Sequence, residues 1–380
     1  MYGQINKLFI IGNGFDLSHG LKTGYCDFIN YIWEEEKKSF IDSFDSNLVA
    51  YKPFYYNSNL FSIKIPVVYN NNPRCHFNED LTGYDYFNIH PNFYHRKDIP
   101  LNNEKIEISI KNKFIKHISE KESLEKWVDI EEEYYLKLKD CLVSTNNDDI
   151  INLNHDFDNL RLLLNNYLSL EMKKEINLIS QIIDKFKNIL QPELIAGNQT
   201  LNDNDRILFL NFNYTNTDKL YINYFKNIIS QIIESNNIHG EIDNANNPII
   251  FGYGDELDEE HKKIENMNNK QYLENEKSVN YAKTPNYRNL LRFIDAYQFD
   301  VYIMGHSCGK SDRTLLNSIF EHKNCKTIKS FYYINENGID DQNDRIMNLY
   351  LNFKDKSLFR EKVIDKTNCE PLLEQHTPPL

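Results

Sequence analysis

Short apolar runs that end in glycine, asparagine or histidine recur along the chain. Residues 8–11, 207–210 and 301–304 are continuous apolar segments, and they run into Gly-Asn-Gly, Asn-Phe-Asn and Gly-His-Ser, respectively. Continuous runs of this length are typical of strands that are buried on both faces, as in a parallel sheet. Further strands are predicted before His239, before Gly252, and over residues 327–334 and 346–353.

Amphipathic segments with a helical period lie between these runs. They are predicted at residues 25–40, in several stretches between 105 and 190, after Thr215 with an apolar face that extends to Ile232, and at residues 287–297. Strands alternating with helices predict an α/β fold with an open parallel, Rossmann-like sheet flanked by helices.

The same pattern predicts how the chain is divided. The α/β core is expected to comprise residues 1–40, 201–255 and 287–365. Residues 41–200 form a large insertion that is irregular over the Asn-, Tyr- and Pro-rich stretch 41–100 and mainly helical afterwards. Residues 256–286 are expected to form a charged surface excursion.

Composition narrows the classes of function. The net charge of −13 disfavours binding of nucleic acid through bulk positive charge. No apolar run is long enough to span a bilayer, and no signal-peptide pattern is present. The six cysteines include no C-x-x-C pair, which fits free thiols in a reducing cytoplasm. A cytoplasmic protein with no membrane partner and no metal is expected, and homo-oligomerisation is left open.

The first strand is followed by the most suggestive loop. Glycine at the carboxyl end of a buried strand lets backbone approach a ligand closely. No glycine stands three residues after Gly14, so the G-x-G-x-x-G dinucleotide fingerprint is incomplete. The residues expected to contact a nucleotide here are Gly12, Asn13, Gly14, Phe15 and Gly20.

A second motif follows the strand at 301–304. Gly305-His306-Ser307-Cys308-Gly309 matches G-x-S-x-G, the nucleophile elbow of serine hydrolases. A triad would draw its acid and its histidine from Asp340, Asp341, Asp344 and His376. Few strands could follow Ser307 to complete that fold, so the hydrolase is an alternative. The related G-x-x-x-G-K-S spacing is one residue too short for a P-loop.

The order of the strand-end motifs resembles that of sirtuin-like NAD-binding proteins. In that family a glycine loop is followed by an Asn-containing loop, a catalytic His-Gly and a late Gly-Thr-Ser. The resemblance implies that Asn213 engages the nicotinamide ribose and that His239 is the catalytic base. It places Gly305, His306 and Ser307 near the adenosine ribose.

A narrower resemblance covers nearly the whole chain. The opening I-I-G-N-G-F-D-L-S-H-G-L-K-T-G-Y-C-D-F, then W-V-D-I-E, N-F-N-Y-T, I-H-G and G-H-S…S-D are similar to the AbiH family of bacterial abortive-infection proteins. This similarity implies a role in phage defence, with a phage-derived trigger. Together the two resemblances imply hydrolysis of NAD to nicotinamide and ADP-ribose without a metal.

The site expected for this reaction comprises His239, Asn213 and Asp16. His239 would accept a proton, Asn213 would orient water or the ribose, and Asp16 would order the nicotinamide ribose. Asp16 stands where the sirtuin loop has serine, so its carboxylate would repel a pyrophosphate placed as in sirtuins. The zinc module of sirtuins has no counterpart here. A nucleotide sensor without catalysis and a metal-dependent nuclease are the remaining rivals, although no clear metal-ligand spacing supports the nuclease.

Overall fold

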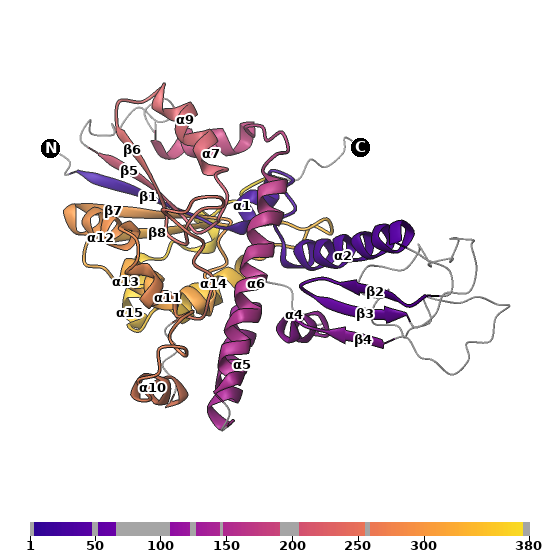
Figure 1. The fold of residues 1–380 in the computed structure, drawn as a ribbon. Helices are drawn as coiled ribbons and strands as arrows, with labels where there is room; N and C mark the ends of the chain where they lie inside the picture. The colour runs from indigo at the N-terminus through magenta and orange to yellow at the C-terminus, as the bar shows by residue number, and fades with distance from the viewer. Residues whose placement is uncertain are drawn as a thin grey trace. The chain divides into compact units, whose positions relative to one another are not determined.

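The computed structural model describes residues 4–47, 52–65, 107–121, 127–144, 147–190, 205–254 and 259–374. The chain divides into two compact units (Figure 1). The sheet unit comprises Met1–Thr23 and Leu168–Leu380, and the insertion unit comprises Gly24–Tyr167. The insertion unit therefore begins and ends earlier than the insertion expected at residues 41–200.

The sheet unit is built on five parallel strands in the order β6-β5-β1-β7-β8. The strands are β1 (Ile5–Ile11), β5 (Arg206–Asn211), β6 (Ile232–Asn237), β7 (Gln298–Met304) and β8 (Cys325–Phe331). The predicted open α/β fold is confirmed. The chain first adds β5 and β6 on one side of β1 and then β7 and β8 on the other. The carboxyl ends of β1 and β7 therefore flank the point where the strand order reverses, which is where ligands bind in such sheets.

Helices cover both faces of this sheet (Figure 1). Alternate residues of β1 point to opposite faces, so Leu8 and Ile10 pack with α12 (Asn286–Ala296) and α13 (Arg313–Phe320). Phe9 and Ile11 pack on the other face with α7 (Ser180–Leu190) and α9 (Asp218–Lys226). Both faces of the strand are buried, as its uninterrupted apolar sequence predicts.

Shorter elements complete the sheet unit. They are α1 (Asn13–Ser18), α10 (Glu259–Asn266), α11 (Lys277–Tyr281), η2 (Lys310–Asp312), α14 (Gln342–Asn352), α15 (Lys356–Lys362) and η3 (Lys366–Asn368). Helices α10 and α11 lie in the stretch expected to be a charged surface excursion. Within the described part of the chain, no helix combines the length and apolar character needed to cross a bilayer.

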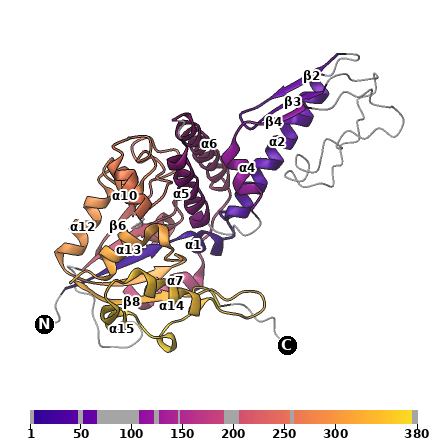
Figure 2. The ribbon, with the colours of Figure 1, turned by 90° about the horizontal axis from the view of Figure 1, so that it is seen from below.

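The insertion unit contains a small antiparallel sheet in the order β2-β3-β4, beside α2 (Figure 2). Its elements are α2 (Tyr25–Asn47), β2 (Phe54–Asn57), β3 (Phe61–Ile65), β4 (Glu107–Ile110), α4 (Lys113–Ser119) and α5 (Trp127–Val143). Helix α6 (Asp148–Glu171) begins in this unit. The rings of Phe44 and Phe54 meet edge to face, 5.0 Å apart, and pack α2 against β2.

Four expectations about secondary structure were wrong. Residues 41–100 are not irregular where they are described, because α2 extends to Asn47 and is followed by β2 and β3. Helix α9 ends at Lys226, and Ile232 begins a strand. Residues 249–251, directly before Gly252, do not form the expected strand, and the chain makes an isolated bridge next to them at Tyr253. Residues 346–353 lie mostly in α14 rather than in a strand.

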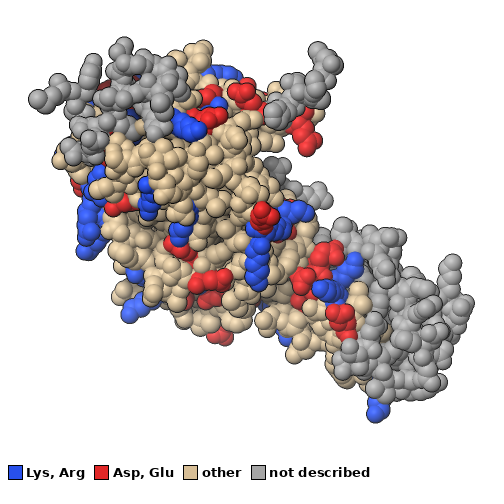
Figure 3. Space-filling model, turned by 90° about the horizontal axis from the view of Figure 1, so that it is seen from above, with Lys and Arg blue, Asp and Glu red and all other residues tan. Residues whose placement is uncertain are grey.

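Charged side chains of both signs lie interspersed on the face drawn in Figure 3. The excess of acidic over basic residues in the sequence is therefore not gathered into one acidic patch on that face.

Candidate functional site

The two glycine loops at the switch point pack directly against each other. The amide of Gly12 donates to the carbonyl of Met304 at 3.1 Å, and the amide of Gly14 donates to the carbonyl of Gly305 at 2.8 Å. A Cβ on Gly12 would lie 2.4 Å from the Cα of His306, so no larger residue fits. These glycines serve the close approach of two loops, and their amides are already bound by carbonyl groups of the chain.

Other residues of the expected nucleotide loop have structural partners too. The side-chain oxygen of Asn13 accepts a hydrogen bond from Thr23 at 2.6 Å, and Phe15 is fully buried beneath the loop. Gly20 has φ +75° just after α1 and supplies the left-handed residue that commonly follows a helix. Gly305 also has φ +75°, and a Cβ there would meet the amide nitrogen of Phe15 at 2.1 Å.

Helix α14 holds the β7 loop through three polar side chains on one face. Arg345 donates to the carbonyl of His306 at 3.2 Å and Asn348 to that of Ser307 at 3.0 Å. Asn352 donates to the carbonyl of Cys308 at 2.8 Å. The spacing of these residues places them on one helical face, so α14 fixes three successive peptide groups and thereby the ring of His306.

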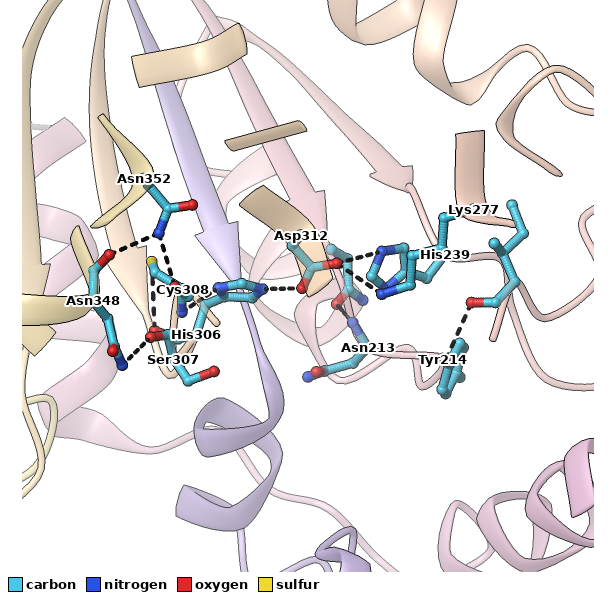
Figure 4. A network of polar contacts seen from close by, with 12 residues as sticks. Asn213, Tyr214, His239, Lys277, His306, Ser307, Cys308, Asp312, Asn348 and Asn352 are labelled. Atoms are coloured by element: carbon cyan, nitrogen blue, oxygen red, sulfur yellow. Dashed lines mark hydrogen bonds and ion pairs between the residues drawn. The ribbon is translucent and has the colours of Figure 1, made fainter. Parts of the chain in front are cut away.

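The structure brings three side chains, two of them from just after strand ends, around one carboxylate, that of Asp312 (Figure 4). Oδ1 of Asp312 lies 3.0 Å from Nζ of Lys277 and 3.3 Å from Nε2 of His239. Oδ2 lies 3.5 Å from Nε2 of His306. His239 follows β6, His306 follows β7, Asp312 ends η2 and Lys277 begins α11. We call Asp312, His239, His306 and Lys277 the Asp312 cluster.

The cluster is buried and strongly polarised. Burial would raise the pKa of Asp312, but the charge of Lys277 together with His239 and His306 holds that pKa well below its usual value of 3.8. Burial lowers the pKa of His306, and the amide of Cys308 donates to its Nδ1 at 3.0 Å. Neutral His306 therefore carries its proton on Nε2, facing Asp312.

The carboxylate of Asp312 also determines which ring nitrogen of His239 carries the proton. An ionised Asp312 only accepts hydrogen bonds, so the nitrogen of His239 that faces it, Nε2, carries the proton in the neutral ring. The hydroxyl oxygen of Tyr281 lies 3.0 Å from the same nitrogen. Nδ1 is then the nitrogen whose lone pair can take up a proton.

Aromatic rings fix the two imidazoles. The ring centroid of Phe212 lies 4.2 Å from that of His306 and 5.1 Å from that of His239. The ring of Tyr281 is parallel to that of His239, with 6.1 Å between centroids. The histidines are therefore oriented by packing as well as by Asp312.

Asn213 binds the first glycine loop. Its side-chain amide donates to the carbonyl of Gly12 at 3.0 Å, and its backbone amide donates to Oδ1 of Asn211 at 2.9 Å. The side chain thus bridges the loops after β5 and β1 at the carboxyl edge of the sheet, and it is buried.

A pocket of about 440 Å³ opens beside the cluster. Its lining residues come from α11, α12, η2 and α13 and from the loops beside them: Gly254, Lys277, Ser278, Tyr281, Ala282, Thr284, Tyr287, Arg288, Ser311, Asp312, Thr314 and Leu315. Its volume lies in the usual range for small-molecule sites. We call it the Asp312 pocket.

Asp16 is placed differently from its expected role. Its carboxylate is buried and accepts a hydrogen bond from the hydroxyl of Thr215. Burial raises its pKa to about 6, against hydrogen bonds that favour the charged form. Asp218, also buried, has its pKa raised to about 6 mainly by burial. Asp16, like His239, His306 and Asn213, is not among the residues that line the Asp312 pocket.

The G-H-S-C-G turn lacks the geometry of a triad in the described part of the chain. Ser307 is exposed, and no hydrogen bond joins its hydroxyl to a histidine. The non-glycine residue of this turn with positive φ, 54°, is Cys308, and burial raises the pKa of its thiol to about 12. His376 lies outside the described residues.

Sequence reasoning missed two members of the cluster. Asp312 stands in the S-D pair that carried part of the family resemblance, a signal that could have marked it. Lys277 lies in a charged stretch that suggests a solvated surface, yet its side chain is only 3% exposed. Nothing in the local sequence distinguishes it from its neighbours.

Comparison with known proteins identifies the family. A family model described as bacteriophage abortive infection AbiH matches residues 8–334, which include every member of the Asp312 cluster. Neither curated proteins nor solved structures include a match to this chain.

Proposed function

The chain belongs to the AbiH family of bacteriophage abortive infection, and on that premise we propose that it is a defence enzyme that hydrolyses NAD to nicotinamide and ADP-ribose. One observation carries the proposal. His239 is held against the ionised Asp312 at the carboxyl edge of a Rossmann-order sheet, beside a pocket large enough for a small ligand. A histidine oriented by a carboxylate is the usual arrangement of a general base.

The reaction breaks the bond between ribose C1′ and the nicotinamide nitrogen. The bonding electrons leave with neutral nicotinamide, and an oxygen of water forms the new bond to C1′. The water loses one proton, which His239 accepts on Nδ1. Asp312 then faces an imidazolium, whose positive charge its carboxylate stabilises.

The other members of the cluster support this role. Lys277 keeps Asp312 charged, because a buried ammonium ion favours the carboxylate over the neutral acid. The Nε2–H group of His306 faces the second carboxylate oxygen of Asp312, Oδ2, at 3.5 Å. Asn213 fixes the loop after β1 and contributes its amide to the same edge of the sheet. The acidic residue of the proposed site is therefore Asp312, which holds His239, and the proposal gives Asp16 no part in the reaction.

A nucleotide sensor that binds the same ligand without turnover is the second candidate, and the first glycine loop limits where either protein could hold the phosphates. The amides of Gly12 and Gly14 are bound by the carbonyls of Met304 and Gly305, so these amides offer no cradle for a pyrophosphate. A substrate held in the Asp312 pocket avoids this obstacle, because the pocket is lined by α11–α13 and η2 and by none of these glycines.

Nicotinamide release from NAD by the purified protein tests the proposal, with and without lysate of phage-infected cells. Release is expected from wild type and is expected to fall at least ~100-fold in His239→Ala. His322→Ala is the matched control, because His322 also faces a carboxylate, Asp295, at 3.2 Å, outside the cluster. Nucleotide binding without release under either condition would support the sensor instead.

A further inference from the structure

The wall of the Asp312 pocket carries one guanidinium group that no acidic side chain of the wall neutralises. Three charged residues line the described pocket: Lys277, Asp312 and Arg288. Lys277 and Asp312 form an ion pair at 3.0 Å, so their charges cancel. Arg288 remains, and no hydrogen bond or ion pair joins it to another described residue.

Four serine and threonine hydroxyl side chains line the same pocket as this charge. They belong to Ser278, Thr284, Ser311 and Thr314. Oγ1 of Thr284 has no hydrogen-bond partner among the described residues. Hydroxyls and a guanidinium are the groups that bind phosphate oxygens, and arginine does so with two parallel hydrogen bonds.

Arg288 is set apart from the catalytic histidine by two tyrosines. The rings of Tyr281 and Tyr287 are parallel, with 5.9 Å between centroids, and Tyr281 also faces His239. His239, Tyr281 and Tyr287 thus form a ladder of rings that leads to the residue before Arg288. A ligand along this ladder would place an anionic group at Arg288 and its reacting end towards His239.

We propose that Arg288 binds a phosphate group of the substrate, so that the Asp312 pocket takes a ribonucleoside monophosphate unit in preference to the nucleoside that lacks the phosphate. The assignment of nicotinamide to the reacting end rests on the proposed function. The phosphate subsite itself rests on Arg288, the hydroxyl groups and the cancelled charges of Lys277 and Asp312.

Calorimetric titration of the full chain with nicotinamide mononucleotide and with nicotinamide riboside tests this subsite. The His239→Ala background prevents turnover during the titration. Adding Arg288→Gln is expected to weaken binding of the mononucleotide ~10–100-fold, which is about 1.4–2.8 kcal/mol, and to change riboside binding less than about twofold. Higher salt is expected to reduce the difference between the two ligands.

Arg292→Gln is the matched control. Arg292 lies one turn further along α12 and lines a different pocket, where it donates to Asn289 at 3.3 Å. It is expected to leave both affinities unchanged. Equal losses for both ligands, no loss with Arg288→Gln, an equal effect of Arg292→Gln, or no binding of the mononucleotide would each overturn the subsite.

The binding test of the Arg288 subsite and the nicotinamide-release test of the proposed function can each fail without the other. If Arg288 determines binding of the mononucleotide but wild type releases no nicotinamide from NAD, the subsite stands and the hydrolase fails. If wild type releases nicotinamide while Arg288→Gln binds both ligands as before, the hydrolase stands and the subsite fails.

Discussion

Replacing Asp312 by asparagine is expected to be among the most destabilising single changes of a polar residue in the sheet unit. The side chain of Lys277 is 3% exposed, and its ammonium lies 3.0 Å from Oδ1 of Asp312. An asparagine side chain at this position would fill the same space but would remove the carboxylate that faces this buried ammonium ion. Removing one partner of a buried ion pair costs about 3–5 kcal/mol, a large share of a typical domain's stability.

Urea unfolding followed by circular dichroism at pH 7.5 would measure this cost. A second variant, Asp312→Asn with Lys277→Met, removes both charges and is expected to recover most of the loss, because it leaves no buried ion unpaired. Glu234→Gln is the control, since the pair it breaks with Arg206 is 43% and 38% exposed and should be worth at most about 1 kcal/mol.

The cost should also depend on pH in a defined direction. The pKa of Asp312 is depressed in the folded protein, so its contribution is present above the unfolded-state pKa near 4 and is lost only as pH falls towards the folded value. The part of the difference between wild type and Asp312→Asn that comes from the ionisation of Asp312 itself should therefore be constant from pH 7.5 to about 5. A cost below about 1 kcal/mol, or a double variant no more stable than Asp312→Asn, would refute the electrostatic account of the cluster.

Three further changes test other parts of the structure. Gly12→Ala places a Cβ 2.4 Å from the Cα of His306 and should cost about 1–3 kcal/mol in urea unfolding; an unchanged midpoint would contradict the packing of the two loops. Burial raises the pKa of Asp16 to about 6, so wild type should lose about 1–2 kcal/mol between pH 5 and 7.5 from this group, and Asp16→Asn should be less pH-dependent. A dependence in that variant at least as steep as in wild type would contradict the raised pKa of Asp16. Ser307→Ala should release nicotinamide at the wild-type rate, and wild type should resist a fluorophosphonate probe; covalent labelling at Ser307 would restore the serine hydrolase.

The sheet could be predicted because its strands carry one unambiguous signal. Strands β1, β5 and β7 each contain four consecutive apolar residues, and such a run is typical of a strand buried on both faces. Helix α14 was mistaken for a strand because its apolar residues were read without their spacing. Leu349 and Phe353 are buried at a helical interval, and Asn348 and Asn352, each one position before them, hold the β7 loop.

The candidate site could be predicted only in part. His239 and His306 stand at strand ends, where topology alone brings them to one edge of the sheet. Lys277 reaches the cluster through tertiary packing of a short helix in a charged stretch, which no local pattern reveals. The glycines of the first loop were expected to let backbone approach a ligand closely. What approaches Gly12 is the backbone of the β7 loop.

The central claim is that this chain defends by destroying NAD through His239, and the NAD pool of infected cells tests it most directly. Cells carrying wild type, His239→Ala or His322→Ala would be infected with phage, and NAD and ADP-ribose would be followed by mass spectrometry. We expect NAD to fall and ADP-ribose to rise before lysis with wild type and His322→Ala, while both stay level with His239→Ala. Defence against phage with a constant NAD pool, or NAD loss that persists in His239→Ala at equal protein level, would contradict the account.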